Sequence, residues 1–252
     1  MNPQPGYSPR GDLLSQRILL VSGAGDGIGR VAAETFAHFG ARVILLGRTT
    51  HKLEAVYDRI AADGPEPFIA PLDLAQTQYA PYEGLALAIE EQFGRLDGLL
   101  HNAGILGPRV SLEHVDPSAW QEVIQVNLTS EFLLTKALLP LLQRSDDASI
   151  VFTSSGVGQR GRAYWRPYAV SKFGVEGLMQ VWADELENTS HIRCNSLDPG
   201  GTRTSMRAQA YPAEDPQSLP IADEHMDLYL YLMGPDSKGI TGQRFEARNW
   251  SI

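Results

Sequence analysis

The chain has 252 residues, of which 43% are hydrophobic and 20% are charged, and its formal net charge is −9. This composition is typical of a globular protein rather than of a disordered chain. The acidic balance argues against nucleic acid or an anionic membrane as the main partner, and no apolar run reaches the roughly 18 to 20 residues that would span a membrane.

The cysteine and histidine content bears on disulfides, metal sites and cellular compartment. The single cysteine, Cys194, excludes an intrachain disulfide and fits a reducing compartment, and the six histidines lack the paired spacing of zinc ligands. We therefore expect a cytoplasmic protein without a metal site. Residues 1–16 are rich in Pro, Gly and Ser and lack the apolar stretch of a signal peptide, so we expect a flexible arm followed by one domain over residues 17–252.

The first predicted unit consists of a strand at residues 17–22, a glycine-rich turn at residues 23–29 and an amphipathic helix that Gly40 ends. Glycines in such a turn let a pyrophosphate approach the N-terminus of the helix, where unpaired N–H groups attract anions. This unit therefore predicts a dinucleotide site.

The second predicted strand, residues 41–46, is followed by Gly47 and Arg48 without an acidic residue. In dinucleotide-binding folds an acid at this position binds the ribose 2′-hydroxyl, whereas an arginine accommodates a 2′-phosphate. Arg48 therefore favours NADP(H) over NAD(H), although Asp26 in the glycine turn counts against a phosphate nearby. The alternative is that Arg48 is a solvated loop residue.

The alternation continues through the middle of the chain. A helix at residues 50–62 and a strand at residues 67–70 lead to Asp73, whose carboxylate could meet an adenine. After a helix at residues 81–93, a strand at residues 96–100 leads into the small residues of the segment 102–104, which indicate backbone close to a ligand. The next helix, residues 117–142, has Pro140 as a candidate kink and contains Asn127 as either a surface residue or a buried polar group.

The stretch after the fifth predicted strand, residues 149–153, points to chemistry. It contains Ser155, Tyr168 and Lys172, and in a helix over residues 164–187 the last two share one face. A neighbouring ammonium lowers the pKa of a phenol from about 10 toward the working range. These groups around one oxygen suit proton transfer to a carbonyl or from an alcohol. Tyr-x-x-x-Lys also occurs by chance in helices, so the upstream units are needed to support this interpretation.

The chain ends with a predicted strand at residues 191–197, an aperiodic segment at residues 205–220, a helix at residues 221–233 and a strand at residues 244–247. The whole pattern predicts an α/β fold of Rossmann type, with a doubly wound, mostly parallel seven-stranded sheet and helices on both faces. Ligands bind outside the carboxyl ends of the strands in such sheets.

Together these residues resemble the short-chain dehydrogenase/reductase family over residues 17–247. The resemblance rests on Gly23, Gly27, Gly29, Asp73, Asn102, Ala103, Gly104, Asn127, Ser155, Tyr168, Lys172, Pro199, Gly200 and Thr204. It implies an NADP(H)-dependent oxidoreductase that moves hydride between the nicotinamide and a small carbonyl or secondary-alcohol substrate, and a homodimer or homotetramer. The run 198–204 also resembles a sub-branch of bacterial oxidoreductases of unassigned substrate.

The resemblance also implies catalytic roles. Tyr168 would be the general acid of reduction and the general base of oxidation, and Lys172 would lower its pKa and hold the nicotinamide ribose. Ser155 would orient the substrate carbonyl, and Asn127 would hold a water that links Lys172 to solvent. The expected cofactor contacts are these catalytic residues Tyr168 and Lys172 together with Ser22, Gly23, Gly25, Asp26, Gly27, Ile28, Gly29, Arg48, Asp73, Leu74, Asn102, Ala103, Gly104, Pro199, Gly200, Thr202 and Thr204.

Two other functions stay open at this point. The first is a 3-oxoacyl-thioester reductase, although Asp184, Glu185 and Glu187 make the end of the tyrosine helix acidic, and an acidic carrier protein would need a basic surface. The second is a catalytically silent dinucleotide-binding sensor, against which the complete catalytic set argues. Arg203 and Arg207 are candidate contacts for an anionic substrate.

Overall fold

The structure is a computed structural model that describes residues 6–250. Within that range, seven strands form one sheet in which every neighbouring pair is parallel. The strands are β1 (Ile18–Ser22), β2 (Arg42–Gly47), β3 (Phe68–Pro71), β4 (Gly98–His101), β5 (Ala148–Thr153), β6 (Ile192–Asp198) and β7 (Arg244–Glu246). Their order, β3-β2-β1-β4-β5-β6-β7, confirms the predicted doubly wound sheet of Rossmann type.

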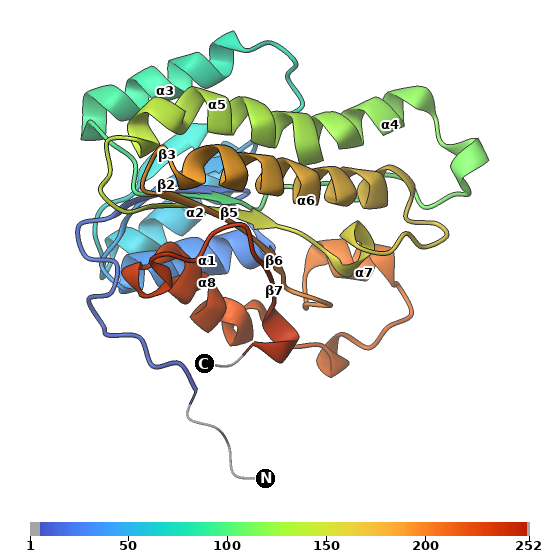
Figure 1. The fold of residues 1–252 in the computed structure, drawn as a ribbon. Coiled ribbons are helices and arrows are strands. Elements are labelled where there is room, and N and C mark those ends of the chain that lie inside the picture. Colours follow the sequence, from blue (N-terminus) through green and yellow to red (C-terminus); the bar gives the residue numbers. More distant parts are fainter. Residues whose placement is uncertain (1–5, 251–252) are drawn as a thin grey trace.

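Helices cover both faces of this sheet (Figure 1). One face carries α1 (Gly27–His38), α2 (Thr50–Ala61) and α8 (Met226–Met233), and the other carries α3 (Ala80–Phe93), α4 (Pro117–Ile124), α5 (Ser130–Leu142) and α6 (Arg166–Glu187). The short helix α7 (Ser205–Ala210) lies within the segment that the sequence presents as aperiodic, and Thr204 caps it by accepting a hydrogen bond from the Arg207 N–H.

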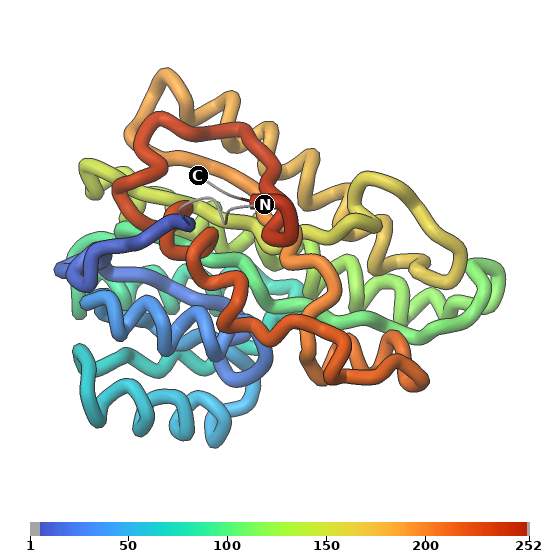
Figure 2. Tube along the Cα trace, turned by 90° about the horizontal axis from the view of Figure 1, so that it is seen from below, coloured from blue at the N-terminus to red at the C-terminus, as the bar shows by residue number. Residues whose placement is uncertain are grey.

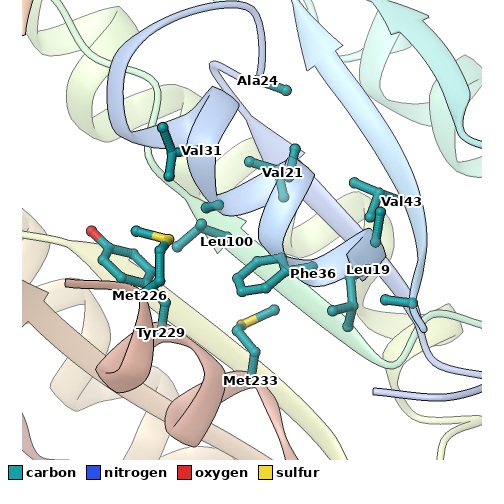
Figure 3. Packing of buried hydrophobic residues seen from close by; sticks show 14 of the residues in the cluster. Leu19, Val21, Ala24, Val31, Phe36, Val43, Leu100, Met226, Tyr229 and Met233 are labelled. Atoms are coloured by element: carbon teal, nitrogen blue, oxygen red, sulfur yellow. The ribbon is translucent and has the colours of Figure 1, made fainter. Parts of the chain in front are cut away.

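Two apolar clusters hold these layers together. On one face Phe36 of α1 packs with Leu19 of β1 and Met233 of α8 (Figure 3). On the other face Leu138 of α5 and Val175 of α6 belong to a second cluster. Strands that are buried on both faces have nearly continuous apolar sequences. The sequence located each strand to within two residues at either end, including β7, which is neither apolar nor buried.

The predicted helix over residues 117–142 is interrupted near its middle. Between α4 and α5 a π-helical turn covers Gln125–Thr129, whereas Pro140 lies inside α5. A π-helical turn inserts an extra residue into a helix and often occurs at functional sites. Here the turn contains Asn127, whose buried carboxamide contacts the loop after β4. The irregular backbone is therefore at the asparagine and not at the proline.

Residues 6–16 pack against the rest of the molecule. Leu13 and Leu14 are 3% and 0% exposed and belong to the cluster that contains α1 and α8. The Tyr7 hydroxyl donates a 2.6 Å hydrogen bond to Asp236, and its ring contacts Tyr231 edge-on. Figure 2 shows this segment, in blue, beside the red C-terminal part of the chain. The prediction of a flexible arm is wrong for these residues, because two adjacent leucines give no period in a Pro- and Gly-rich run. Residues 1–5 lie outside the described range.

We expect Leu14→Ala to lower the free energy of unfolding by at least about 2 kcal/mol, because it leaves a cavity in a close-packed cluster. Urea denaturation measures the loss. Gly11→Ala is the matched control in the same segment, since a β-carbon there meets no atom within 4 Å among the described residues. A loss for Leu14→Ala as small as that of the control would show that the segment contributes nothing to stability.

Candidate active site

A cavity of about 730 Å³ opens along the carboxyl ends of the strands. Its volume is in the range of small-molecule sites. Most of the expected site residues line it, namely Gly23, Gly25, Asp26, Gly27, Ile28, Arg48, Asp73, Leu74, Asn102, Ala103, Gly104, Ser155, Tyr168, Lys172, Pro199, Gly200, Thr202 and Thr204. Three other expected residues do not line the cavity, namely Ser22, Gly29 and Asn127.

The glycine turn is shaped by close backbone contacts. Gly23 has a left-handed backbone with φ of 69°, which a residue with a side chain rarely adopts. A β-carbon on Gly29 would lie 2.4 Å from the Gly23 carbonyl oxygen. The Ser22 hydroxyl accepts hydrogen bonds from the N–H groups of Asn102 and Ala103 at 2.9 and 3.1 Å, so it ties the turn to the end of β4. These contacts hold the N-terminus of α1 against the cavity.

Asp26 is neutralised by a lysine that the sequence analysis misses. Its carboxylate accepts hydrogen bonds from the Gly27 N–H at 2.7 Å and from Lys52 Nζ at 2.8 Å. The hydrogen bond from Lys52 is the largest cause that lowers the pKa of Asp26. Lys52 lines the cavity together with Arg48. The objection that Asp26 repels a phosphate is therefore weakened. In the sequence, Lys52 could have been noticed as a second cationic residue four positions after Arg48.

Tyr168 and Lys172 both lie in the first half of α6, but their contacts differ from the expected ones. Lys172 Nζ donates a 2.7 Å hydrogen bond to the Thr153 carbonyl oxygen and lies 6.0 Å from the centre of the Tyr168 ring. Burial raises the pKa of Tyr168 to about 12, although a hydrogen bond with Ser155 lowers it. Burial has the larger effect, and Lys172 is not among the groups that shift this pKa, so the lowering of the phenol pKa by the lysine stays a prediction. The raised pKa leaves the phenol protonated at neutral pH.

Asn127 joins two segments of the site. Its Oδ1 accepts a 2.8 Å hydrogen bond from the Ile105 N–H, and its Nδ2 donates to the Ile105 carbonyl oxygen at 2.9 Å. Nδ2 also contacts the hydroxyl of Ser171, the residue before Lys172, at 3.2 Å. The asparagine thus fixes the loop after β4 against α6. The alternative that it is an ordinary surface residue is wrong, because it is fully buried.

Buried charges around the catalytic residues were also missed. Asp198 of β6 accepts a 2.9 Å hydrogen bond from Arg244 of β7, which also donates to Glu176 of α6 at 3.2 Å. Glu131 of α5 lies 3.9 Å from Lys172. The sequence signal for Glu131 was its position one helical turn after Asn127, on the same face of the helix.

The expected anion-binding arginines are engaged within the protein. Arg207 lines the cavity but pairs with Glu214 at 2.6 Å. Arg203 donates hydrogen bonds to the carbonyl oxygens of Pro216 and Leu219 at 2.8 and 3.2 Å. These contacts stabilise the segment around α7.

Residues 6–250 contain no cluster of three or more His, Cys, Asp and Glu side chains that could hold a metal ion. In the same part of the chain, no helix is both long and apolar enough to cross a membrane.

A doubly wound sheet with a glycine-lined cleft and a buried Tyr–Lys pair beside it defines a short-chain dehydrogenase. The family model described as short chain dehydrogenase matches residues 17–215, and the chain belongs to this family. The protein is therefore an oxidoreductase of the class that the sequence analysis expects.

Similar proteins agree with this assignment. The oxidoreductase YciK of Escherichia coli (strain K12) is 51% identical over 243 residues, which cover 96% of each chain. A short chain dehydrogenase of Shigella flexneri 2a strain 301, solved as a complex with NADP, has 50% identity and a TM-score of 0.92, with 95% of this chain and 100% of that chain covered. One from Escherichia coli CFT073, complexed with NADPH, has 51% identity and a TM-score of 0.93, with the same coverage.

Proposed function

We propose that the protein is an NADP(H)-dependent oxidoreductase that interconverts a carbonyl compound and a secondary alcohol. The observation that carries this proposal is the single cavity that has the glycine turn and Arg48 on one side and Ser155, Tyr168 and Lys172 on the other. A cofactor bound along the strand ends would meet a proton donor in the same cavity. The NADP and NADPH complexes of the two relatives support this choice of cofactor.

The residues suit a dinucleotide phosphate. The cavity is lined from the end of β3 to the end of β6, which is five strand spacings or about 24 Å. The N-terminus of α1 and the glycine turn would hold the pyrophosphate. Arg48 would bind the 2′-phosphate, while Asp73 and Leu74 would contact the adenine. Asn102, Ala103 and Gly104 would line the centre of the cofactor site, and Pro199, Gly200, Thr202 and Thr204 would contact the nicotinamide end, where the bound cofactor supplies the hydride.

The chain itself supplies the proton and the electrostatic environment. Tyr168 donates its phenolic proton to the carbonyl oxygen during reduction and takes it back during oxidation. Ser155 holds the same oxygen and stabilises charge that develops on it. Because burial keeps the phenol protonated at neutral pH, the site is prepared for reduction. Lys172 supplies a positive charge on the same side, and Asn127 fixes the segment that carries it.

We further propose that the protein is a cytoplasmic homo-oligomer that associates through α5 and α6. Exposed apolar side chains remain on these two helices, namely Phe132, Val170, Phe173 and Val181. Exposed apolar side chains on neighbouring helices are typical of protein interfaces when they form one patch.

NADPH oxidation against a panel of ketones, quinones and 3-oxoacyl thioesters tests the proposed function. Turnover of a ketone or quinone supports it. Turnover restricted to carrier-bound thioesters would instead support the 3-oxoacyl reductase. No turnover on any member of a broad panel would contradict the proposal.

We expect Arg48→Ala to weaken NADPH binding by about tenfold or more, because it removes a charged partner of the 2′-phosphate. NADH binding should stay nearly unchanged, since NADH lacks that phosphate. Fluorescence titration with both cofactors measures the difference. Arg42→Ala is the control, because Arg42 is exposed at the opposite end of β2 and does not line the cavity. Equal losses for both cofactors would show that Arg48 does not bind the phosphate.

A further inference from the structure

Glu131 is a carboxylate buried beside the catalytic lysine. It lies in the first turn of α5 and is 3% exposed. Its Oε1 is 3.9 Å from Lys172 Nζ, and neither carboxylate oxygen has a hydrogen-bond partner within residues 6–250. A buried carboxylate without hydrogen bonds destabilises a protein unless a nearby cation compensates its charge. Burial raises the pKa of Glu131 and outweighs the charge of Lys172, which lowers it, so the carboxyl gains its full negative charge in the alkaline range.

Lys172 in turn is a buried cation that needs a nearby negative charge. Its side chain is almost fully buried, and among the described residues it donates a hydrogen bond only to the Thr153 carbonyl oxygen. An ammonium carries three N–H donors, so one carbonyl oxygen compensates it only in part. Burial lowers the pKa of Lys172, and the negative charges of Glu131 and Glu176 oppose this effect. The lysine therefore depends on nearby anions to stay charged.

Two other buried carboxylates of the site, of which Glu176 acts on the charge of Lys172, are already paired. Glu176 of α6 accepts hydrogen bonds from Arg244 at 3.2 Å and from the Ser196 hydroxyl at 2.8 Å. Asp198 of β6 also accepts from Arg244. Arg244 therefore compensates both of these acids, and the effect of Glu176 on Lys172 is reduced.

The remaining titratable neighbours are neutral. His101 of β4 contacts the Thr135 hydroxyl at 2.8 Å, and burial lowers its pKa to about 3. The phenol of Tyr168 is protonated because burial raises its pKa to about 12. Of the groups that face Lys172 within residues 6–250, Glu131 is thus the carboxylate without another partner.

We propose that Glu131 is a positioning residue that keeps the buried Lys172 in its ammonium form. The inference deepens the proposed function and rests on it, because the charge of Lys172 matters only if Tyr168 acts as the acid. The negative charge of Glu131 makes the loss of a proton from Lys172 harder. Glu131 lies on α5, whereas the Thr153 carbonyl oxygen that accepts the ammonium hydrogen bond lies at the end of β5. Glu131 therefore affects the charge of Lys172 and leaves this hydrogen bond in place.

The first test measures the lysine directly and needs no substrate. The chain has four lysines, Lys52, Lys136, Lys172 and Lys238, and of these Lys172 is the buried one. Carbon-13 labelling of the lysine side chains gives a small NMR spectrum in which Lys172 is assigned by substitution. We expect Glu131→Gln to move the Lys172 titration midpoint to lower pH by about one unit or more. Glu131→Asp keeps the charge and should restore much of the midpoint.

Asp97→Asn is the matched control for this titration. Asp97 is also a buried carboxylate, but it precedes β4 at the amino end of the sheet, where it accepts hydrogen bonds from Ser145 and Arg95. Its substitution should leave the Lys172 midpoint in place. If Lys172 loses its proton at the same pH in wild type and in Glu131→Gln, the inference is overturned.

The second test follows the pH dependence of carbonyl reduction. Removal of a negative charge makes the first deprotonation of the Tyr168–Lys172 pair easier. Reduction consumes the proton of Tyr168 and requires Lys172 in its charged form, so Glu131→Gln should move the alkaline limb of the kcat/KM profile to lower pH. A purely structural role would lower activity at every pH and leave the limb in place. If wild type turns over no carbonyl, the proposed function fails, and the lysine titration still decides the role of Glu131.

Discussion

Tyr168→Phe is expected to lower kcat/KM for NADPH-dependent carbonyl reduction by about 10² to 10⁴-fold, the usual contribution of a positioned general acid. The substitution deletes the phenolic oxygen and leaves the ring, which packs with Trp165 at 5.6 Å between ring centres. The shape of the cavity should therefore persist. Initial rates over a range of carbonyl concentrations measure the loss.

Cofactor affinity separates this loss from a damaged site. Because the glycine turn and Arg48 lie away from Tyr168, the NADPH dissociation constant should change little. Tyr82→Phe is the matched control, since Tyr82 is a buried tyrosine of α3 that does not line the cavity. A Tyr168→Phe protein that reduces carbonyls at a rate near that of wild type would refute the assignment of the acid.

Lys172→Met is expected to lower stability as well as activity. The substitution leaves Glu131 buried without its cation, and removal of one partner from a buried ion pair typically destabilises a protein by about 3 to 5 kcal/mol. Turnover should fall because the positive charge on the substrate side of α6 is lost. Urea denaturation measures the first effect, and NADPH oxidation measures the second.

The stability loss of Lys172→Met should depend on pH. Burial raises the pKa of Glu131 above its unfolded value, which is about 4.3, and without Lys172 the pKa rises further. Below the unfolded pKa the carboxyl is protonated in both states, so the variant keeps its stability there. As the pH rises toward the folded pKa, the unfolded state loses its proton first and unfolding becomes easier. We therefore expect a larger loss at about pH 8 than at about pH 5.

The double variant Lys172→Met with Glu131→Gln provides the control. It removes both charges, so it should recover much of the stability and lose the added pH dependence. If the single and double variants are equally unstable at both pH values, the two side chains do not interact in the folded protein.

Local patterns were sufficient for much of this protein. Apolar runs predicted strands such as β1 and β2, because strands buried on both faces have few polar residues, whereas β7 has the sequence Arg-Phe-Glu and is not buried. The glycine turn was recognisable since its place between a strand and a helix is itself a local feature. Tyr168 and Lys172 were expected to lie together because they share one face of a helix, and Ser155 was expected at the ligand-binding edge because it follows a strand. The structure places all three in one cavity.

Features that depend on long-range packing were not predictable in this way. Leu13 and Leu14 show no period, and their burial depends on a surface formed by α1 and α8. Asp26 looked like an obstacle to a phosphate until the fold brought Lys52 to its carboxylate, 26 residues away in the sequence. Spacing along the chain does not identify which distant side chain compensates a given charge.

The sequence by itself determined the fold class, the family and the edge of the sheet at which the chemistry takes place. Only the tertiary structure decided which charges and hydrogen bonds surround the catalytic side chains. It turned the Lys172 ammonium toward the Thr153 carbonyl, buried the Tyr168 phenol so that its pKa rises, and placed Glu131 beside the lysine. The physical reason is that a pKa depends on burial and on charges from several elements, whereas a motif specifies only spacing along one of them.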